Sequence, residues 1–176
     1  MLTTKAGVQP GQTVLVQGVG GGVATAAIAL AHQLGARVWA TSRDESKRAA
    51  AVELGADEAF ESGARLPERV DAVMESVGEA TWSHSLKSLK PGGRLVVCGA
   101  TSGPNPPADL NRVFFLQLQV LGSTMGTLEE LIALTDLMVS TGLRPTISAT
   151  YPLAQARDAL EQLASGDVIG KIVLTV

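Results

Sequence analysis

The feature that most constrains this chain is a cluster of four glycines at residues 18–22, between an apolar run and an alanine-rich run. The preceding stretch, TVLVQG (13–18), is short and rich in β-branched residues, which predicts a buried strand. The following stretch, VATAAIALAHQLG (23–35), has helical spacing and ends at a glycine. A strand that turns into a helix through glycines predicts an anion-binding loop, because backbone N–H groups gather there at the positive end of the helix dipole.

The rest of the chain repeats this alternation. Strands are predicted at 36–42, 57–60, 70–76, 94–100 and 119–124, and helices at 44–56, 79–90, 108–118 and 127–142, whereas 61–69 is too short and broken for a helix. Repeated strand–helix units predict an α/β fold with a doubly wound parallel sheet of six strands in the order 3-2-1-4-5-6, the dinucleotide-binding Rossmann architecture. We assign residues 1–145 to this domain and 146–176 to a C-terminal strand–helix–strand tail.

Composition removes several classes of function. The net charge of −3 and the lack of a basic stripe argue against nucleic-acid binding, and no apolar run is long enough to span a membrane. The N-terminus lacks the apolar core of a signal peptide, so we expect a cytoplasmic location. A single cysteine, Cys98, and two separated histidines, His32 and His84, do not form a zinc-binding pattern, and we predict no metal site.

The spacing of the glycines departs from the usual G-x-G-x-x-G fingerprint by one residue. The register that fits is Gly18-x-x-Gly21-x-x-Ala24, in which Ala24 is small enough for close packing of the helix on the strand. The predicted phosphate-binding loop comprises Gly18, Gly20, Gly21, Gly22, Val23 and Ala24. The alternative is a tight turn in an α/β protein that binds no nucleotide.

The end of the second predicted strand bears on the choice of cofactor. An acidic residue there would select NAD, whereas this chain has Ser42 followed by Arg43, with Lys47 one helical turn later. A serine and an arginine can bind the 2′-phosphate of NADP, so we favour NADP(H) over NAD(H). The alternative is an ordinary solvated face. Ser42 and Glu45 also have the spacing of a helix capping box.

Several further motifs occur in order along the chain: VQPGQTVLVQGVGGGVATAAIALAHQLGARVWATS, ELGAD, VMESVG, LKPGGRLVVCGATSG, LGSTMGT and GKIVL. Together they resemble the cofactor-binding half of the medium-chain dehydrogenase/reductase superfamily, in its zinc-type alcohol dehydrogenase and quinone oxidoreductase branches. The resemblance covers nearly the whole chain. The longer glycine loop is similar to that of the quinone reductases, and Ala24 stands where the family usually has glycine.

The resemblance implies further cofactor contacts. Ser76 and Val77 would lie on the adenine and ribose side, and Met125 would lie beside the nicotinamide. Lys171 would reach the pyrophosphate. The loop after the fifth strand would approach the nicotinamide ribose through Gly99, Ala100 and Thr101. Core packing of Met125 and simple solvation of Lys171 are the alternatives.

The resemblance also implies that the chain is a fragment that lacks a catalytic domain, with Met1, Leu2 and the tail strand exposed where that domain belongs. The resemblance leaves open whether the parent enzyme uses zinc, which would then lie only in that absent domain. The implied function is hydride transfer by an NADPH-dependent oxidoreductase, with a homodimer formed through the edge strand 119–124. We predict no catalytic residue in the chain: Cys98 should be an inert core thiol and His84 a surface residue.

Two other functions remain open. A free-standing dinucleotide-binding or dimerisation module would show the same loop without catalysis of its own. A domain that binds S-adenosylmethionine also carries a glycine loop, although such domains usually keep an acid where this chain has Ser42. No Tyr-x-x-x-Lys pair is present, which argues against a short-chain dehydrogenase.

Overall fold

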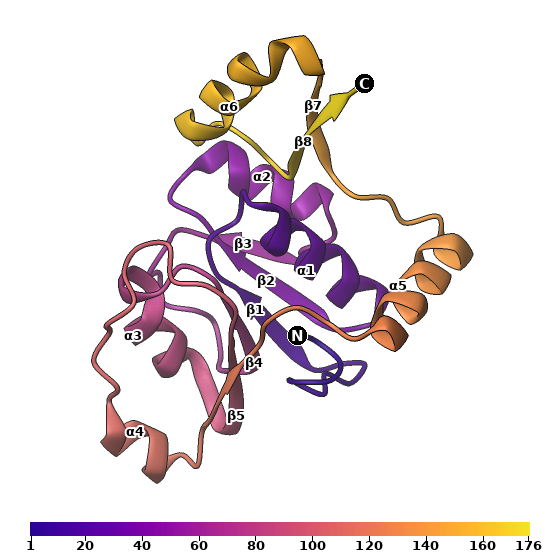
Figure 1. Cartoon of the computed structure of the whole chain (residues 1–176). Helices are drawn as coiled ribbons and strands as arrows, with labels where there is room; N and C mark the ends of the chain where they lie inside the picture. Colours follow the sequence, from indigo (N-terminus) through magenta and orange to yellow (C-terminus); the bar gives the residue numbers. More distant parts are fainter.

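Six parallel strands form one sheet in the computed structural model, which describes residues 1–176 (Figure 1). Their order is β3-β2-β1-β4-β5-β6, which confirms the predicted topology. The strands are β1 (Thr13–Val16), β2 (Arg37–Thr41), β3 (Glu58–Phe60), β4 (Val70–Glu75), β5 (Leu89–Val97) and β6 (Gln119–Gly122). All pairs are parallel, so the carboxyl ends of the strands share one edge of the sheet.

Apolar side chains cover both faces of this sheet. Along β1, Val14 and Val16 join a core cluster with α1 (Gly22–Gln33), α2 (Glu45–Glu53) and the N-terminal segment. The alternate residue, Leu15, faces the opposite cluster, which includes Leu86 of α3 (Glu79–Ser88). The side chains of a strand alternate between faces, so strands buried on both sides read as continuous apolar runs. This is why the strand positions were predictable.

The boundary between α3 and β5 differs from the prediction. We expected a turn at Pro91-Gly92-Gly93 and a strand only from residue 94, but β5 already begins at Leu89. Leu89 pairs with Val70 and Arg94 pairs with Ala72, so residues 90–93 bulge out of the ladder. Gly92 supplies the positive φ of 73° that the bulge requires. The turn residues are therefore an irregularity inside one strand.

The C-terminal residues form a separate small unit, coloured from orange to yellow at the top of Figure 1. It contains β7 (Ile147–Pro152), a 3₁₀ turn (Leu153–Gln155), α6 (Ala156–Ser165) and β8 (Lys171–Thr175). The two strands pair in parallel with each other and not with the main sheet. The predicted strand–helix–strand tail is thus present.

The N-terminus is more buried than expected. The segment folds back on itself, because the Ala6 N–H bonds the Met1 carbonyl at 2.9 Å and the Val8 N–H bonds the Leu2 carbonyl at 3.0 Å. Leu2 is only 6% exposed and joins the core under α1, and Met1 packs against the same cluster. The expectation that both residues face solvent is wrong, because this turn directs them inward.

Two helices remain largely exposed. α4 (Leu110–Phe115) and α5 (Leu128–Thr141) contain no buried residue. α5 is held at its start by a hydrogen bond from the Thr4 hydroxyl to the Glu130 carboxylate. None of the helices is long and apolar enough to cross a membrane.

Candidate functional site

The glycine loop links the carboxyl end of β1 to the start of α1. Gly18 and Gly20 have positive φ angles of 71° and 146°, which side chains rarely adopt. Gly21 is the N-cap of α1, and no side chain caps the helix. The backbone N–H groups of the first turn are therefore left for an anion at the positive end of the helix dipole.

A Cβ atom added to each glycine shows which positions have room for a side chain. At Gly18 it would collide with the Val77 side chain, and at Gly22 with the Lys171 side chain. At Gly21, whose φ of −71° suits any residue, it would meet nothing within 4 Å. Neither the backbone nor the packing of the chain itself requires glycine at position 21. The space beside it is open to a ligand.

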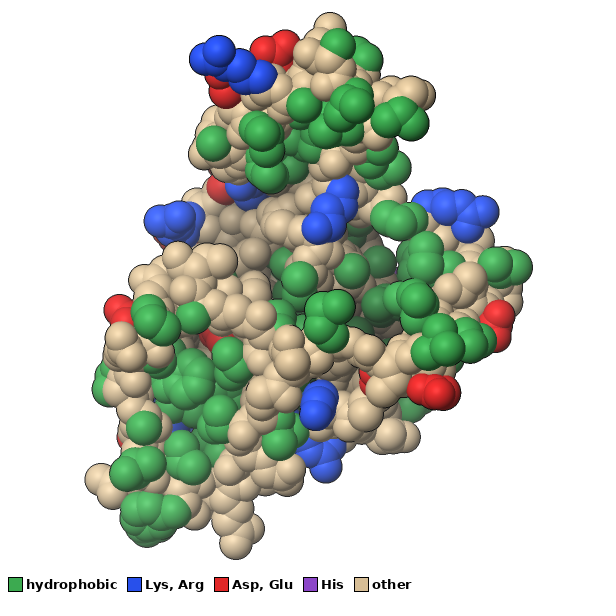
Figure 2. Space-filling view, in the orientation of Figure 1, with side chains coloured by type: hydrophobic (Ala, Val, Ile, Leu, Met, Phe, Trp, Pro, Cys, Tyr) green, Lys and Arg blue, Asp and Glu red, His purple; other side chains and the backbone are tan.

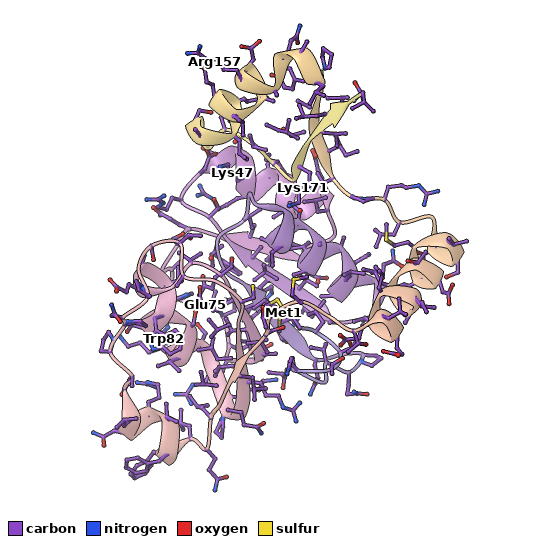
Figure 3. All side chains as sticks on the ribbon, viewed as in Figure 1. Met1, Lys47, Glu75, Trp82, Arg157 and Lys171 are labelled. Atoms are coloured by element: carbon purple, nitrogen blue, oxygen red, sulfur yellow. The ribbon has the colours of Figure 1, made fainter.

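Two lysines flank this loop from distant parts of the chain (Figure 3). A Cβ added at Gly20 would lie 3.4 Å from the Lys47 Nζ, and one added at Gly22 would lie 3.0 Å from the Lys171 Nζ. Neither lysine forms an ion pair. Lys47 donates instead to the Gly166 carbonyl at 2.5 Å. We placed Lys47 with the residues at the end of β2, and the structure places its amine over the glycine loop.

The C-terminal unit touches the same loop. The Gly170 N–H donates to the Gly20 carbonyl at 2.7 Å, and Gly170 forms an isolated bridge with Gly21. This contact brings Lys171, the next residue, to the start of α1. In Figure 2 a hollow lies below the C-terminal unit and beside α5, with basic side chains at its upper rim. Figure 3, in the same orientation, labels Lys171 at that rim.

Ser42 and Arg43 lie at the end of β2 as predicted, but the N-cap of the following helix, α2, differs from the prediction. Ser42 is only 5% exposed, and its hydroxyl accepts from the Asp44 N–H at 3.2 Å, while Arg43 is exposed. The N-cap of α2 is Asp44, so the predicted capping box of Ser42 and Glu45 is wrong. Hydrogen bonds from the Ser46 hydroxyl and the Lys47 N–H hold the pKa of the Asp44 carboxyl below its ordinary value.

The loops that follow β4 and β5 lie against each other. The Thr101 N–H donates to the Ser76 carbonyl at 3.4 Å, and a Cβ on Gly99 would stand 3.1 Å from the same carbonyl. Val77 in turn lies against Gly18. The predicted residues Ser76, Val77, Gly99 and Thr101 are thus joined to the glycine loop, and Ala100 is exposed between them.

Met125 lies farther away, after the edge strand β6, which is separated from β1 by β4 and β5. It is 95% exposed and has a positive φ of 53°. Core packing is therefore not its role. A large apolar side chain in this strained and exposed position is available for contact with a ligand or another chain.

Sequence reasoning missed a set of buried polar residues directly beneath this edge of the sheet. Gln17 and Glu75 are fully buried at the ends of β1 and β4. Gln17 donates to His84 Nδ1 at 2.8 Å, and His84 Nε2 lies 2.9 Å from the Ala64 carbonyl. His84 is half-buried and bonded at both nitrogens, so its prediction as a surface residue is wrong. In the sequence, a polar residue directly follows each apolar run, Gln17 after TVLV and Glu75 after VDAVM, and this pattern could have predicted the set.

The remaining polar features do not form a second reactive centre. Burial raises the pKa of the Cys98 thiol, as expected for an unreactive cysteine, although Cys98 is half-buried and lies just beyond β5. No group of three or more His, Cys, Asp or Glu residues could hold a metal ion, so the residues present do not fit zinc. A cavity of about 430 Å³ between loop 63–69 and α3 contains none of the predicted cofactor residues.

Comparisons with known proteins show which family the chain is similar to. The zinc-binding dehydrogenase family matches residues 22–140. A quinone oxidoreductase from Sus scrofa is 30% identical over 185 residues, which cover 95% of this chain and 55% of that protein. A crystal structure of an NAD-dependent alcohol dehydrogenase has a TM-score of 0.91 and 34% identity, covering 100% of this chain and 54% of the other.

A second solved structure adds a bound cofactor to the comparison. The 2-octenoyl-CoA carboxylase reductase CinF, solved with NADP and 2-octenoyl-CoA, has a TM-score of 0.92 and 25% identity, covering 99% of this chain and 46% of that one. The chain therefore spans about half the length of these relatives.

Proposed function

The chain belongs to the zinc-binding dehydrogenase family, within the medium-chain dehydrogenase/reductase superfamily, and on that premise we propose that it binds the nicotinamide dinucleotide of an NADPH-dependent oxidoreductase. The whole enzyme would transfer hydride to or from a carbonyl, alcohol or activated alkene. The observation that carries the proposal is the open space at Gly21, bordered by an uncapped helix N-terminus and two lysines without acidic partners.

The residues fit the pyrophosphate of a dinucleotide. The loop from Gly18 to Ala24 would hold the phosphates by its backbone N–H groups, and Lys171 and Lys47 would neutralise their charge. Ser76 and Val77 would line the adenosine side. Gly99, Ala100, Thr101 and Met125 would line the nicotinamide side. The bound cofactor supplies the hydride chemistry, while this chain binds and orients it.

Two features at the end of β2 support NADP(H) over NAD(H). Ser42 presents a hydroxyl whose oxygen already accepts from Asp44, so its hydrogen is free to donate to a phosphate. Arg43 is exposed and forms no ion pair. The relatives include both an NAD-dependent enzyme and an NADP complex.

A titration of NADPH and NADH against the chain tests this assignment. We expect tighter binding of NADPH, and we expect Arg43→Ala to weaken NADPH by about ten-fold while changing NADH little, because one charge-assisted hydrogen bond is lost. Arg144→Ala, a change at another exposed arginine that forms no ion pair and is not among the proposed cofactor residues, is the control.

The titration also has two contrary outcomes. Tighter binding of NADH would overturn the preference for NADP. If neither dinucleotide binds, the proposed function fails and an association module becomes the better description. The open edge of β6 supports that second candidate, because an unpaired parallel strand can pair with a second chain.

A further inference from the structure

A buried polar residue stands immediately before each of three predicted cofactor segments. Gln17 precedes Gly18, Thr41 precedes Ser42, and Glu75 precedes Ser76. Each of these three side chains is 0% exposed. Gln17, Thr41 and Glu75 lie at the carboxyl ends of β1, β2 and β4, respectively, and these strands are neighbours in the sheet. The coincidence raises the question of what this buried row does.

Hydrogen bonds connect the three residues into one row. The Thr41 hydroxyl donates to Gln17 Oε1 at 2.5 Å, and Gln17 Nε2 donates to the Ser85 hydroxyl of α3 at 3.0 Å. The Ser85 hydroxyl donates in turn to Glu75 Oε2 at 2.6 Å. Thr41, Gln17, Ser85 and Glu75, which we call the buried relay, therefore link β2, β1, α3 and β4 beneath the glycine loop.

Glu75 is the anchor of the buried relay. Its carboxylate accepts from the Val77 N–H at 2.8 Å and the Gly78 N–H at 3.1 Å, and the Thr81 hydroxyl lies 2.9 Å from both of its oxygens. It forms no ion pair. A buried carboxylate without a cation is held by its hydrogen-bond donors alone, here at the N-terminus of α3. Figure 3 shows Glu75 beside this helix.

These bonds fix a contact that shapes the loop. Glu75 holds the backbone of Val77, and the Val77 side chain occupies the space that a Cβ on Gly18 would need. The position of Val77 therefore limits where the first turn of the glycine loop can lie. At the other end of the relay, Thr41 accepts a hydrogen bond at its carbonyl from the Val19 N–H at 2.9 Å.

We propose that Glu75 is a positioning residue for dinucleotide binding, which holds the ends of β1, β2 and β4 in register through the buried relay. The inference rests on the proposed function. Glu75 touches no cofactor in this scheme. It acts by fixing Val77 against Gly18 and, through Ser85 and Gln17, by fixing the strand ends that carry the phosphate-binding and ribose-binding segments.

Glu75→Gln tests the proposal with little change in volume. An amide NH₂ cannot accept hydrogen bonds, so at least one donor around Glu75 loses its partner. We expect NADPH binding to weaken by about ten-fold or more. We also expect faster amide hydrogen exchange, without cofactor, at Val77, Gly78 and the segments after Gln17 and Thr41.

Asp71→Asn is the matched control. Asp71 lies on the same strand and, like Glu75, accepts from a backbone N–H, here Thr13 N at 2.8 Å. Unlike Glu75, it also pairs with a cation, Lys90 Nζ, at 2.8 Å. It lies at the opposite end of β4 from the glycine loop. We expect Asp71→Asn to lower the denaturant midpoint but to leave the dissociation constant of NADPH unchanged.

A second pair covers the case in which Glu75→Gln fails to fold. Thr81→Val removes one hydroxyl donor to Glu75 at constant shape, and Thr81→Ser keeps it. We expect weaker NADPH binding and faster exchange at Val77 for the valine variant, with rescue by the serine variant. If all folded variants bind NADPH with equal affinity, the inference about Glu75 fails while the proposed function stands. The same holds if Asp71→Asn also loses affinity for NADPH in proportion to its loss of stability. Absence of binding by the unmodified chain would overturn the proposed function together with the inference.

Discussion

At the scale of single residues, glycine occurs at each position of the glycine loop for a different physical reason. Gly18 needs both its positive φ and its missing side chain, because Val77 lies against it. Gly22 has an ordinary backbone but is covered by Lys171. Gly21 has neither constraint and faces open space. The spacing Gly18-x-x-Gly21-x-x-Ala24 was predicted from the sequence, and only the three-dimensional neighbours separate the structural glycines from the one that faces the space proposed for the ligand.

This distinction predicts the effect of Gly21→Val. The fold should be retained, because nothing lies within 4 Å of the added Cβ and the φ of −71° suits valine. Dinucleotide binding should be lost, because the side chain would fill the space proposed for the pyrophosphate. Titration with NADPH and a thermal melt check both parts. Gly122→Val, where the added Cβ also meets nothing within 4 Å, is the control. Unchanged affinity in Gly21→Val would contradict our interpretation of the loop.

A second prediction at this scale concerns Cys98. Because burial raises the pKa of its thiol, the thiolate fraction at neutral pH is smaller than that of a free cysteine. Alkylation by iodoacetamide at pH 7 should therefore be slower than for a cysteine in a short peptide, and it should accelerate as the pH rises. Mass spectrometry gives the rate. A rate equal to or above that of the peptide would show that Cys98 is a reactive thiol.

At the scale of elements, the helix starts show how local signals compete. Two acids and two serines lie within residues 42–46, and the sequence spacing predicted a capping box of Ser42 and Glu45 at the start of α2. The structure uses Asp44, whose carboxylate accepts from Ser46 N at 2.8 Å. The Ser42 N–H donates to the carbonyl of Phe60, the last residue of β3, and this hydrogen bond holds Ser42 at the end of β2. A tertiary contact therefore decided a local choice.

The cap of α2 predicts a pH dependence of stability. The pKa of Asp44 is lower in the folded chain than the ordinary 3.8, so its contribution is complete above that pH and is lost as the pH falls through the folded value. Asp44→Ala should be less stable than the unmodified chain at pH 7, and the gap should narrow at pH 3. Urea unfolding at both values measures it. Asp44→Asn retains a side-chain acceptor for the cap and is the control. A gap that widens at pH 3 would contradict the assignment.

At the scale of the whole molecule, exposed apolar side chains concentrate outside the main sheet. Phe114 and Phe115 of α4 are 62% and 81% exposed, and α5 exposes several leucine, isoleucine and valine residues (Figure 2). The C-terminal unit adds Ile147 and Leu174. Exposed apolar surface of this extent is typical of interaction sites. β6, which lies between these two helices in the chain, forms the edge of the sheet, with Val120 44% exposed.

The edge strand leads to a prediction about association. If two chains pair through β6, the chain should be a dimer in solution, and Val120→Lys should produce monomers by placing two like charges near the two-fold axis. Light scattering across a range of concentrations measures the mass. Lys5→Ala, an exposed change in the N-terminal segment, is the control. A strict monomer at the highest concentration would contradict pairing through β6.

The sequence by itself determined the order of strands and helices, the glycine loop and the separate tail, because these follow from residue periodicity and turn chemistry over a few neighbouring positions. Tertiary structure alone decided which distant residues surround the loop. Lys47 of α2 lies beside Gly20, and the hydrogen bond from the Gly170 N–H to the Gly20 carbonyl brings Lys171 beside Gly22. Gln17 and Glu75 come together beneath the loop because the strand order 3-2-1-4-5-6 places the ends of β1 and β4 side by side, and Ser85 of α3 links them. Burial of Leu2 was missed for the same reason: its partners lie across the fold and not beside it in the chain.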